Sequence, residues 1–304
     1  MKGGSSMRLN PVLRNESKLS VRTPRFSLMI LIYIGVLSVG TLIFYNSYSR
    51  DVYASGINPQ GAVTLYITMA VIQAILLMFI VPSLTATSIC SEREKQTLDI
   101  LLSTRLTPLQ IILGKLSASS LKVIMLVICT IPLYAICGLI GGVKLSNILL
   151  LTGSFIINTI FVGAIGVFIS SYSKTSKAAT ALTYALVLFI FVGTIVIAFI
   201  IVSLNSYNGV YSGNNTPQIP IIAYLSPATG FFIMLSNQVG FGGNSFYFIG
   251  QMGVNKYADY ISIAIQLVLS VIFIYFAARK LNPLKGKVKF KKIRKEGTKK
   301  KVKE

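Results

Sequence analysis

Long apolar segments, separated by short polar connections, run through most of this sequence. Each segment carries few charges over about 18 residues or more, the length that a helix needs to cross a bilayer. The regular alternation of apolar and polar residues that is typical of membrane β-strands is absent. The sequence therefore predicts an all-α membrane protein with six transmembrane helices. The predicted helices cover residues 26–45, 63–89, 116–140, 148–171, 178–204 and 260–278.

The charges narrow the class of protein further. Charged residues make up 12% of the chain, about half of the share in an average soluble protein. The net charge of +21 would by itself suggest a nucleic-acid partner, but the basic residues gather beside the apolar segments. Six precede the first predicted helix and thirteen lie from Arg279 onward. Basic residues in these positions bind lipid headgroups, so we expect anionic lipids and no nucleic acid as partners.

The basic residues also predict an orientation in the cell membrane. The connections at residues 90–115 and 172–177 carry six basic residues, whereas the connections on the opposite side carry three. The positive-inside rule places the more basic side in the cytoplasm. Because the number of predicted helices is even, both termini fall on that cytoplasmic side.

We expect three regions along the chain. Residues 1–25 form a basic cytoplasmic helix in the membrane interface, where Asn10 caps the helix and Pro11 takes its first position; a flexible basic tail is the alternative. Residues 26–280 form the six-helix transmembrane domain. Residues 281–304 form a polybasic cytoplasmic tail.

The longest connection, residues 205–259, lies on the extracytoplasmic side of the predicted topology. It is rich in Asn, Gly, Ser and Tyr, and its apolar middle, residues 224–235, is too short to cross the membrane. We expect a short extracytoplasmic helix there, between the fifth and sixth transmembrane helices. This helix either gates the outer face or only covers the top of the bundle.

Residues 92–115 form a charged island between two apolar segments. Its first four residues, Glu92–Lys95, are all charged, and each would cost about 2.5–3.5 kcal/mol at the centre of a bilayer, so the island lies in water at a membrane face. Thr97 can cap a short helix with Asp99 in its first turn, and leucines at helical spacing give that helix an apolar stripe. The helix either docks a soluble partner or rests its leucines on lipid headgroups.

The charged island resembles the cytoplasmic loop of ABC-2 type transporter permeases over the run E-R-E-K-Q-T-L-D-I-L-L-S-T-R-L-T-P-L-Q-I-I-L-G-K. The sequence departs from the family pattern at Arg105, where proline is usual, and at Gln96, where glycine is frequent. A second resemblance lies near the N-terminus, in a segment that often precedes the first transmembrane helix of these permeases. The residues that carry it are Asn10, Pro11, Leu13 and Glu16.

The resemblance implies the permease subunit of an ABC exporter. The short helix would be a cytoplasmic coupling helix, between the second and third transmembrane helices, that docks on a separate ATPase subunit holding ATP and Mg²⁺. A second permease subunit, identical or paralogous, would complete the membrane part. Leucines of the coupling helix would fill an apolar cleft on the ATPase, and its acids would pair with basic residues there. The residues implied in coupling are Glu92, Glu94, Thr97, Leu98, Asp99, Leu101, Leu102 and Arg105.

Sequence motifs for catalysis are missing. The chain has no histidine, no phosphate-binding G-x-x-x-x-G-K-[ST] loop and no cysteine spacing typical of a metal site. We therefore expect no enzymatic activity, no bound cofactor and no metal in this chain. The alternative function is a non-transporting membrane anchor or sensor that docks an ATPase-like partner.

Polar residues inside the predicted helices are candidates for a translocation path. Lys122 either reaches back to the cytoplasmic headgroups or lines a path for an anionic or amphipathic substrate. Gln73 and Asn158 either join helices by hydrogen bonds or contact the substrate. So few charges within the predicted helices favour an apolar or amphipathic substrate.

Overall fold

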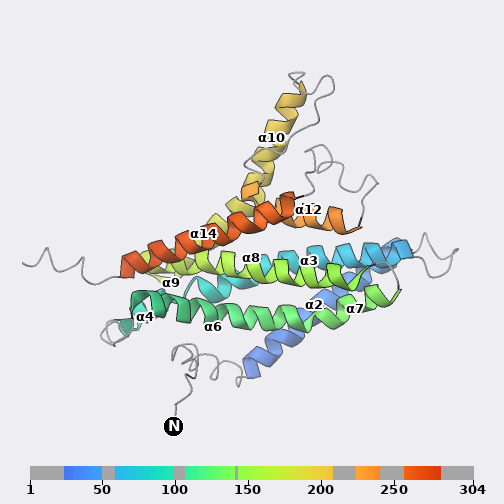
Figure 1. Ribbon diagram of the computed structural model, residues 1–304. Helices are drawn as coiled ribbons and strands as arrows, with labels where there is room; N and C mark the ends of the chain where they lie inside the picture. The colour runs from blue at the N-terminus through green and yellow to red at the C-terminus, as the bar shows by residue number, and fades with distance from the viewer. Residues whose placement is uncertain are drawn as a thin grey trace, which may run out of the picture.

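The computed structural model describes residues 24–49, 59–98, 107–140, 143–207, 224–239 and 257–281. Within these residues every regular element is a helix, and no strand occurs (Figure 1). The elements are α2 (Pro24–Ser49), α3 (Pro59–Thr85), α4 (Cys90–Glu94), α6 (Pro108–Cys129), α7 (Ile131–Ile140), α8 (Leu145–Tyr172), α9 (Ser176–Leu188), the π-helix η1 (Phe189–Gly193), α10 (Thr194–Tyr207), α12 (Pro227–Val239) and α14 (Ala258–Leu281).

Six helical runs are long and apolar enough to cross a membrane, which confirms the predicted all-α membrane fold. The runs are α2, α3 continuing to α4, α6 with α7, α8, α9 with η1 and the start of α10, and α14. Each run begins a few residues before its predicted range, because polar first turns extend the helices beyond their apolar parts. Pro24, Pro59 and Pro108 each open a helix, the position where a missing backbone N–H costs least.

The third transmembrane run is broken about two thirds of the way along its length. α6 ends at Cys129 and α7 begins at Ile131, with Pro132 in the first turn of α7. Proline has no N–H to continue the hydrogen-bond ladder of a preceding helix, so the ladder stops here. The Val127 carbonyl accepts the backbone N–H of Thr130 at 3.2 Å and the Thr130 hydroxyl at 2.7 Å, so the last turn of α6 is closed by Thr130.

The fifth transmembrane run changes its helical pitch at η1. The residues of η1, Phe189–Gly193, form a π-helix between α9 and α10, and α10 extends away from the other helices (Figure 1). Nothing in the sequence of this segment predicts the change, because η1 contains only apolar residues and one glycine, and apolar residues of the same kinds occur in the α-helices on either side of it. π-Helical turns are often found at functional sites in membrane and soluble proteins.

α8 is the central helix of the bundle, and it packs against α3, α6, α9 and α14. Two glycines on α8 allow the closest of these contacts. A Cβ atom on Gly166 would lie 2.2 Å from the Thr85 hydroxyl oxygen of α3, and one on Gly163 would lie 2.9 Å from a Leu116 methyl group of α6. Small residues that let helix backbones approach are the usual packing device in membranes, where apolar burial between helices gains little.

The outer surface of the bundle is apolar. Leu31, Leu139 and Val271 are among the large apolar side chains that are more than half exposed, and Leu139 is 87% exposed. A soluble protein rarely carries so much exposed apolar surface, whereas hydrocarbon around a membrane bundle covers it. The exposed side chains therefore agree with a multi-pass membrane protein.

The connection between the fifth and sixth transmembrane runs contains α12. This helix packs against α8 and α14, and it begins three residues after the predicted start at residue 224 and ends after the predicted residue 235. Phe231 and Leu235 are buried, and the Phe231 ring lies 5.6 Å from the Phe155 ring of α8. The helix is thus packed on the bundle. Its position on the extracytoplasmic side stays a prediction.

Candidate functional site

A tight turn connects α3 to α4, the short helix at the start of the charged island. α3 ends at Thr85, and α4 begins at Cys90 after a turn. The Ser170 hydroxyl of α8 accepts hydrogen bonds of 3.0 Å from the backbone N–H groups of both Ile89 and Cys90. These are donors that a helix start leaves without intrahelical partners. The break between α3 and α4 is therefore stabilised by α8, and α4 is held against the end of that helix.

Arg93 of α4 binds the last carbonyl groups of α8. One guanidinium nitrogen donates to the Ser173 carbonyl at 2.5 Å, and the other donates to the Ser171 carbonyl at 3.1 Å. Carbonyls at a helix C-terminus lack intrahelical donors and carry the negative end of the helix dipole. A cation at this position therefore satisfies two acceptors and attaches α4 to the end of α8.

Glu94 binds the start of α9, just as Arg93 binds the end of α8. Its carboxylate accepts hydrogen bonds from the Ser176 backbone N–H at 2.7 Å and from the Ser176 hydroxyl at 2.5 Å. Thr175 precedes α9 and accepts a hydrogen bond from Ala178, so the helix start is capped twice. The hydrogen bonds from Ser176 lower the pKa of Glu94, because they stabilise its charged form. An anion at the positive end of α9 is also favourable.

Glu92 joins α4 to α6. Its carboxylate lies 2.9 Å from the Lys115 ammonium, and it accepts a second hydrogen bond from the Thr97 hydroxyl at 2.5 Å. The Lys115 side chain is only 8% exposed and the Glu92 side chain is 30% exposed. Burial alone would raise the pKa of Glu92, but the hydrogen bonds from Thr97 and Lys115 outweigh it and lower the pKa below its usual value.

We call Glu92, Arg93 and Glu94 the clamp. Together these residues connect α4 to the start of α6, the end of α8 and the start of α9. All three contacts involve a charged group, and such hydrogen bonds are shorter and stronger than neutral ones. Figure 1 shows α4 beside the start of α6 and of α9 at one end of the bundle, with α7 and α12 at the opposite end.

Only part of the predicted coupling set lies within the described residues. Thr97 follows α4 and donates to Glu92, and Leu98 is helical and packs on the apolar cluster that contains Ile89 and Ile112. Leu98 therefore contacts the bundle. The remaining members lie outside the described residues, as do the predicted residues of the N-terminal interfacial helix. These residues are Asp99, Leu101, Leu102, Arg105, Asn10, Pro11, Leu13 and Glu16.

Sequence reasoning did not identify Lys115 as the partner of Glu92, and it gave no role to Arg93 or to the serines that these side chains bind. It assigned Glu92 and Glu94 to basic residues on a partner, whereas the structure pairs both with groups of this chain. A signal was present in the charges themselves, because Arg93 and Glu94 are each suited to one kind of helix end. Their partners could not be identified, because that needs the ends of α8 and α9 to be placed beside α4.

The predicted path residues have different surroundings. Gln73 is fully buried; its amide nitrogen donates to the Thr130 hydroxyl at 3.1 Å, and its amide oxygen accepts from the Tyr134 hydroxyl at 2.6 Å. It therefore joins α3 to both sides of the break between α6 and α7. Lys122 is half-buried and makes no hydrogen bond or ion pair within the described residues. Whether either residue contacts a substrate stays a prediction.

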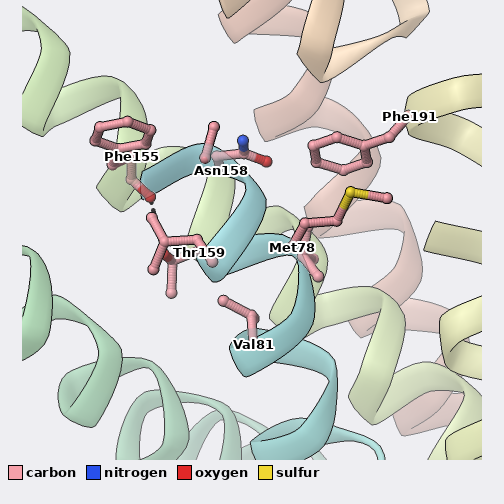
Figure 2. A pocket seen from close by; sticks show the side chains of 9 residues that line it. Met78, Val81, Phe155, Asn158, Thr159 and Phe191 are labelled. Atoms are coloured by element: carbon pink, nitrogen blue, oxygen red, sulfur yellow. Dashed lines mark hydrogen bonds between the residues drawn. The ribbon is translucent and has the colours of Figure 1, made fainter. Parts of the chain in front are cut away.

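Asn158 lines a small cavity between α3, α8 and η1. Figure 2 shows its side chain near Met78 of α3 and Phe191 of η1. The cavity measures about 10 Å³, and the Asn158 amide oxygen has no hydrogen-bond partner within the described residues. A space of this size holds about one water molecule. It is too small for a transported molecule in this conformation.

Comparison with known proteins identifies the family. The family model described as ABC-2 family transporter protein matches residues 11–283, which is most of the chain. No curated protein matches the sequence. The match extends from the segment before α2 to the end of α14, and so includes every transmembrane run and the charged island. The chain therefore belongs to the ABC-2 transporter family, whose members are membrane subunits of ABC transporters.

Proposed function

We propose that this chain is the permease subunit of an exporter, in which a separate ATPase subunit docks on the charged island and drives transport. Family membership and the multi-pass fold support this proposal. The basic connections and tails favour a cytoplasmic location for the island in the cell membrane, with both termini on the same side. ATP and Mg²⁺ are held by the partner, and this chain carries out no hydrolysis.

The clamp is the observation that carries the proposal. It connects α4 to Lys115 within α6, to the end of α8 and to the start of α9, so a displacement of the island is transmitted to all three helices at once. Packed helices respond to such a displacement as rigid bodies and not by continuous deformation. In this account the three helices tilt together when ATP binding closes the ATPase. The cavity between the two permease subunits then opens to the other side of the membrane.

Docking and transmission belong to different parts of the island. Glu92 and Glu94 are engaged with Lys115 and Ser176, so their role is to transmit movement. Docking on the ATPase is assigned to residues 99–106, through the apolar side chains of Leu101 and Leu102 and the charge of Asp99. Charged pairs across such an interface set the orientation more than the affinity.

The membrane part requires a second permease subunit. The cavity at Asn158 holds only about one water molecule, and we assign the path to the boundary between two permease subunits. The apolar helix faces and the scarcity of charges within them favour an apolar or amphipathic substrate. Anionic lipids are expected at the basic tails.

The test uses the tagged chain purified from its native membranes with the ATPase that accompanies it, followed by reconstitution in lipid vesicles. Leu101→Asp is expected to abolish recovery of the ATPase, because a charge replaces an apolar docking group. Glu94→Gln is expected to leave ATPase recovery intact and to lower ATP turnover several-fold, because the helix start of α9 loses its anion.

Lys95→Gln is the matched control, since Lys95 is exposed at the end of α4. It is expected to change neither recovery nor turnover. If Leu101→Asp retains the ATPase, the docking assignment is wrong. If the assembled complex shows no ATP-dependent movement of substrate in any screen while Glu94→Gln has normal turnover, the anchor or sensor function is supported instead.

A further inference from the structure

Lys122 is the basic side chain that lies deepest in the transmembrane runs that the structure describes. Leu116 of α6 lies against Gly163 of α8, and Gly138 of α7 lies against Ile148 of α8. The third and fourth runs are therefore antiparallel. Lys122 follows Leu116 by less than two helical turns, so it is level with the middle of α8.

The middle of α8 is too deep in a membrane for a lysine to reach the headgroups. α8 has 28 residues and rises about 42 Å. The hydrocarbon of a bilayer is about 30 Å thick, so at least about 9 Å of it separates the middle of this helix from either edge. The four-carbon stem of lysine is shorter than this distance. Extension of the side chain along the bundle therefore does not bring the Lys122 ammonium to water.

Lys122 lies on a face of α6 that is open to the outside of the bundle. Its side chain is half-buried, and Met125 and Cys129 are exposed at three and seven residues further along the same face. The helices that pack on α6 supply no hydrogen bond or ion pair to Lys122 within the described part of the chain. Hydrocarbon on this face would leave the ammonium without a partner, at a large cost in free energy.

The acidic residues of this chain do not lie at the level of Lys122. The sequence has eight of them. Glu92 and Glu94 end the second run and bind Lys115 and Ser176, and Asp259 begins the sixth run. The other five lie outside the six runs: Glu16, Asp51, Asp99, Glu296 and Glu304. A second copy of the chain has the same distribution, so the counter-ion of Lys122 comes from another molecule.

We propose that Lys122 binds the anionic head group, a carboxylate or a phosphate, of an amphiphile that this subunit transports. The ammonium donates hydrogen bonds to the head group, and the exposed apolar side chains of Leu121, Met125 and Ile128 contact the tail. The inference rests on the proposed function, which assigns the path to the boundary between two permease subunits. It names the class of substrate at that boundary. Charged residues within membrane spans usually face such a path.

The experiment uses an introduced tryptophan as a reporter, because the chain has none of its own. Met125→Trp places the reporter one turn from Lys122, and Leu139→Trp places it on an exposed position of α7 as a control. The purified full chain is titrated in a fixed detergent with bromohexanoate, bromohexanol and bromohexyltrimethylammonium. These probes share one tail, whose terminal bromine quenches tryptophan fluorescence on contact, and they differ in the head group.

Bromohexanoate is expected to half-quench Met125→Trp at a concentration about tenfold lower than in the same variant with Lys122→Gln. This is the loss typical of a hydrogen bond between charged groups. Bromohexanol is expected to quench both proteins equally, and Lys122→Gln is expected to change nothing at Leu139→Trp. Equal quenching by bromohexanoate with and without Lys122 would overturn the proposal, as would a preference for the trimethylammonium probe.

Two further variants separate binding from a role in the fold. Lys122→Arg retains the charge and is expected to retain the preference for bromohexanoate over bromohexanol. Lys122→Gln is expected to leave the unfolding midpoint unchanged or to raise it, because it removes a charge without a partner in the described protein. A lower midpoint with an unchanged preference for bromohexanoate would show that Lys122 only maintains the fold, and would overturn the proposal.

A transported substrate is distinguished from a resident lipid in the assembled complex. Decanoate is added to phosphatidylcholine vesicles that contain the chain with its ATPase. It is expected to raise ATP turnover several-fold in the wild type and not in Lys122→Gln. If phosphatidylglycerol abolishes the quenching by bromohexanoate and decanoate leaves turnover unchanged, the site holds a resident lipid, and the assignment of the substrate is overturned.

Failure of this test is distinguishable from failure of the proposed function. The quenching measurement needs neither ATP nor an ATPase, whereas Leu101→Asp changes only the recovery of the ATPase. A preference for bromohexanoate in a chain whose complex transports nothing would retain the site and remove the exporter. Normal coupling without this preference would retain the exporter and remove the site.

Discussion

Gln96 has a backbone conformation that suits glycine. Its φ angle is 57°, in the left-handed region, where a side chain other than glycine costs of order 1 kcal/mol. The resembling family loop often has glycine at this position, and the geometry gives the physical reason. The chain must reverse direction between the end of α4 and Thr97, whose backbone N–H donates to the Glu92 carbonyl at 2.9 Å.

Gln96→Gly is therefore expected to stabilise the protein, by about 0.5–1 kcal/mol, because the strain is relieved. The measurement is the unfolding transition of the purified protein in a fixed detergent. Lys95→Gly is the matched control: Lys95 has a φ of −80°, which any residue adopts, so glycine there is expected to destabilise. Equal effects of the two substitutions would show that the left-handed conformation carries no strain.

Glu92 has a predictable effect on acid stability. The pKa of Glu92 is lowered in the folded state. Its contribution to the free energy of unfolding is therefore complete above the ordinary carboxyl pKa of 4.5, and it is lost as the pH falls through the lowered pKa of the folded state. Glu92→Gln is expected to destabilise the protein at neutral pH by about 1–3 kcal/mol, since the buried Lys115 ammonium loses its partner. The measurement is the unfolding midpoint as a function of pH.

The difference in unfolding midpoint between the wild type and Glu92→Gln is expected to become smaller as the pH falls. Lys115→Met removes the buried charge together with its need for a partner, and so serves as the comparison. If Glu92→Gln destabilises no more than Lys95→Gln at neutral pH, the ion pair contributes nothing to the fold. A difference that grows as the pH falls would contradict the lowered pKa.

At the scale of helices, packing around α8 depends on the absence of side chains at chosen positions. A Cβ at residue 166 would overlap Thr85 of α3, whereas a Cβ at residue 153 of the same helix meets nothing within 4 Å. Gly166 is therefore required for close helix packing, whereas Gly153 of the same helix is not. Only Gly166 allows α3 to approach so closely that the Thr85 hydroxyl is enclosed.

Gly166→Ala is expected to destabilise the protein by about 1–3 kcal/mol, the usual cost of overpacking a filled interior. Gly153→Ala is the control and is expected to be neutral or slightly stabilising, because alanine favours the helix and fits the space. Thermal unfolding of the two variants side by side is the measurement. A neutral Gly166→Ala would mean that α3 moves away at no cost, and that the contact does not hold these helices together.

The apolar pattern predicted the helices well because length and hydropathy are local properties. Six runs of sufficient length follow directly from the spacing of polar residues, and the helix starts at Pro24, Pro59 and Pro108 could have been read from the prolines. The π-helix at Phe189–Gly193 could not, since no residue in that apolar stretch distinguishes a π-helix from an α-helix.

Only part of the clamp could be predicted, because sequence patterns report on neighbouring residues and not on contacts between distant ones. The charges of Glu92 and Glu94 indicated a membrane edge, but their partners lie about twenty and eighty residues away in sequence. Only the packing of α4 against α6, α8 and α9 brings those partners together.

For the whole molecule, α8 is the element that connects the two polar ends. Its 28 residues span about 42 Å, at 1.5 Å per residue. Ser170 and Ser171 contact the clamp region at one end, and the Asn147 side chain donates to the Gln238 carbonyl of α12 at the other. A rigid helix between the two sites is a direct physical route for coupling, because a tilt at one end moves the other.

The Glu92–Lys115 pair allows the coupling route to be tested by exchange of its charges. ATP turnover is measured in vesicles containing the assembled complex, for Glu92→Lys, Lys115→Glu and the variant with both changes. Each single change places like charges together and is expected to lower turnover several-fold in complexes that still contain the ATPase. The double change restores the attraction and is expected to recover most of the wild-type turnover. Full turnover in both single variants would contradict the account, because the island would then drive transport without its attachment to α6.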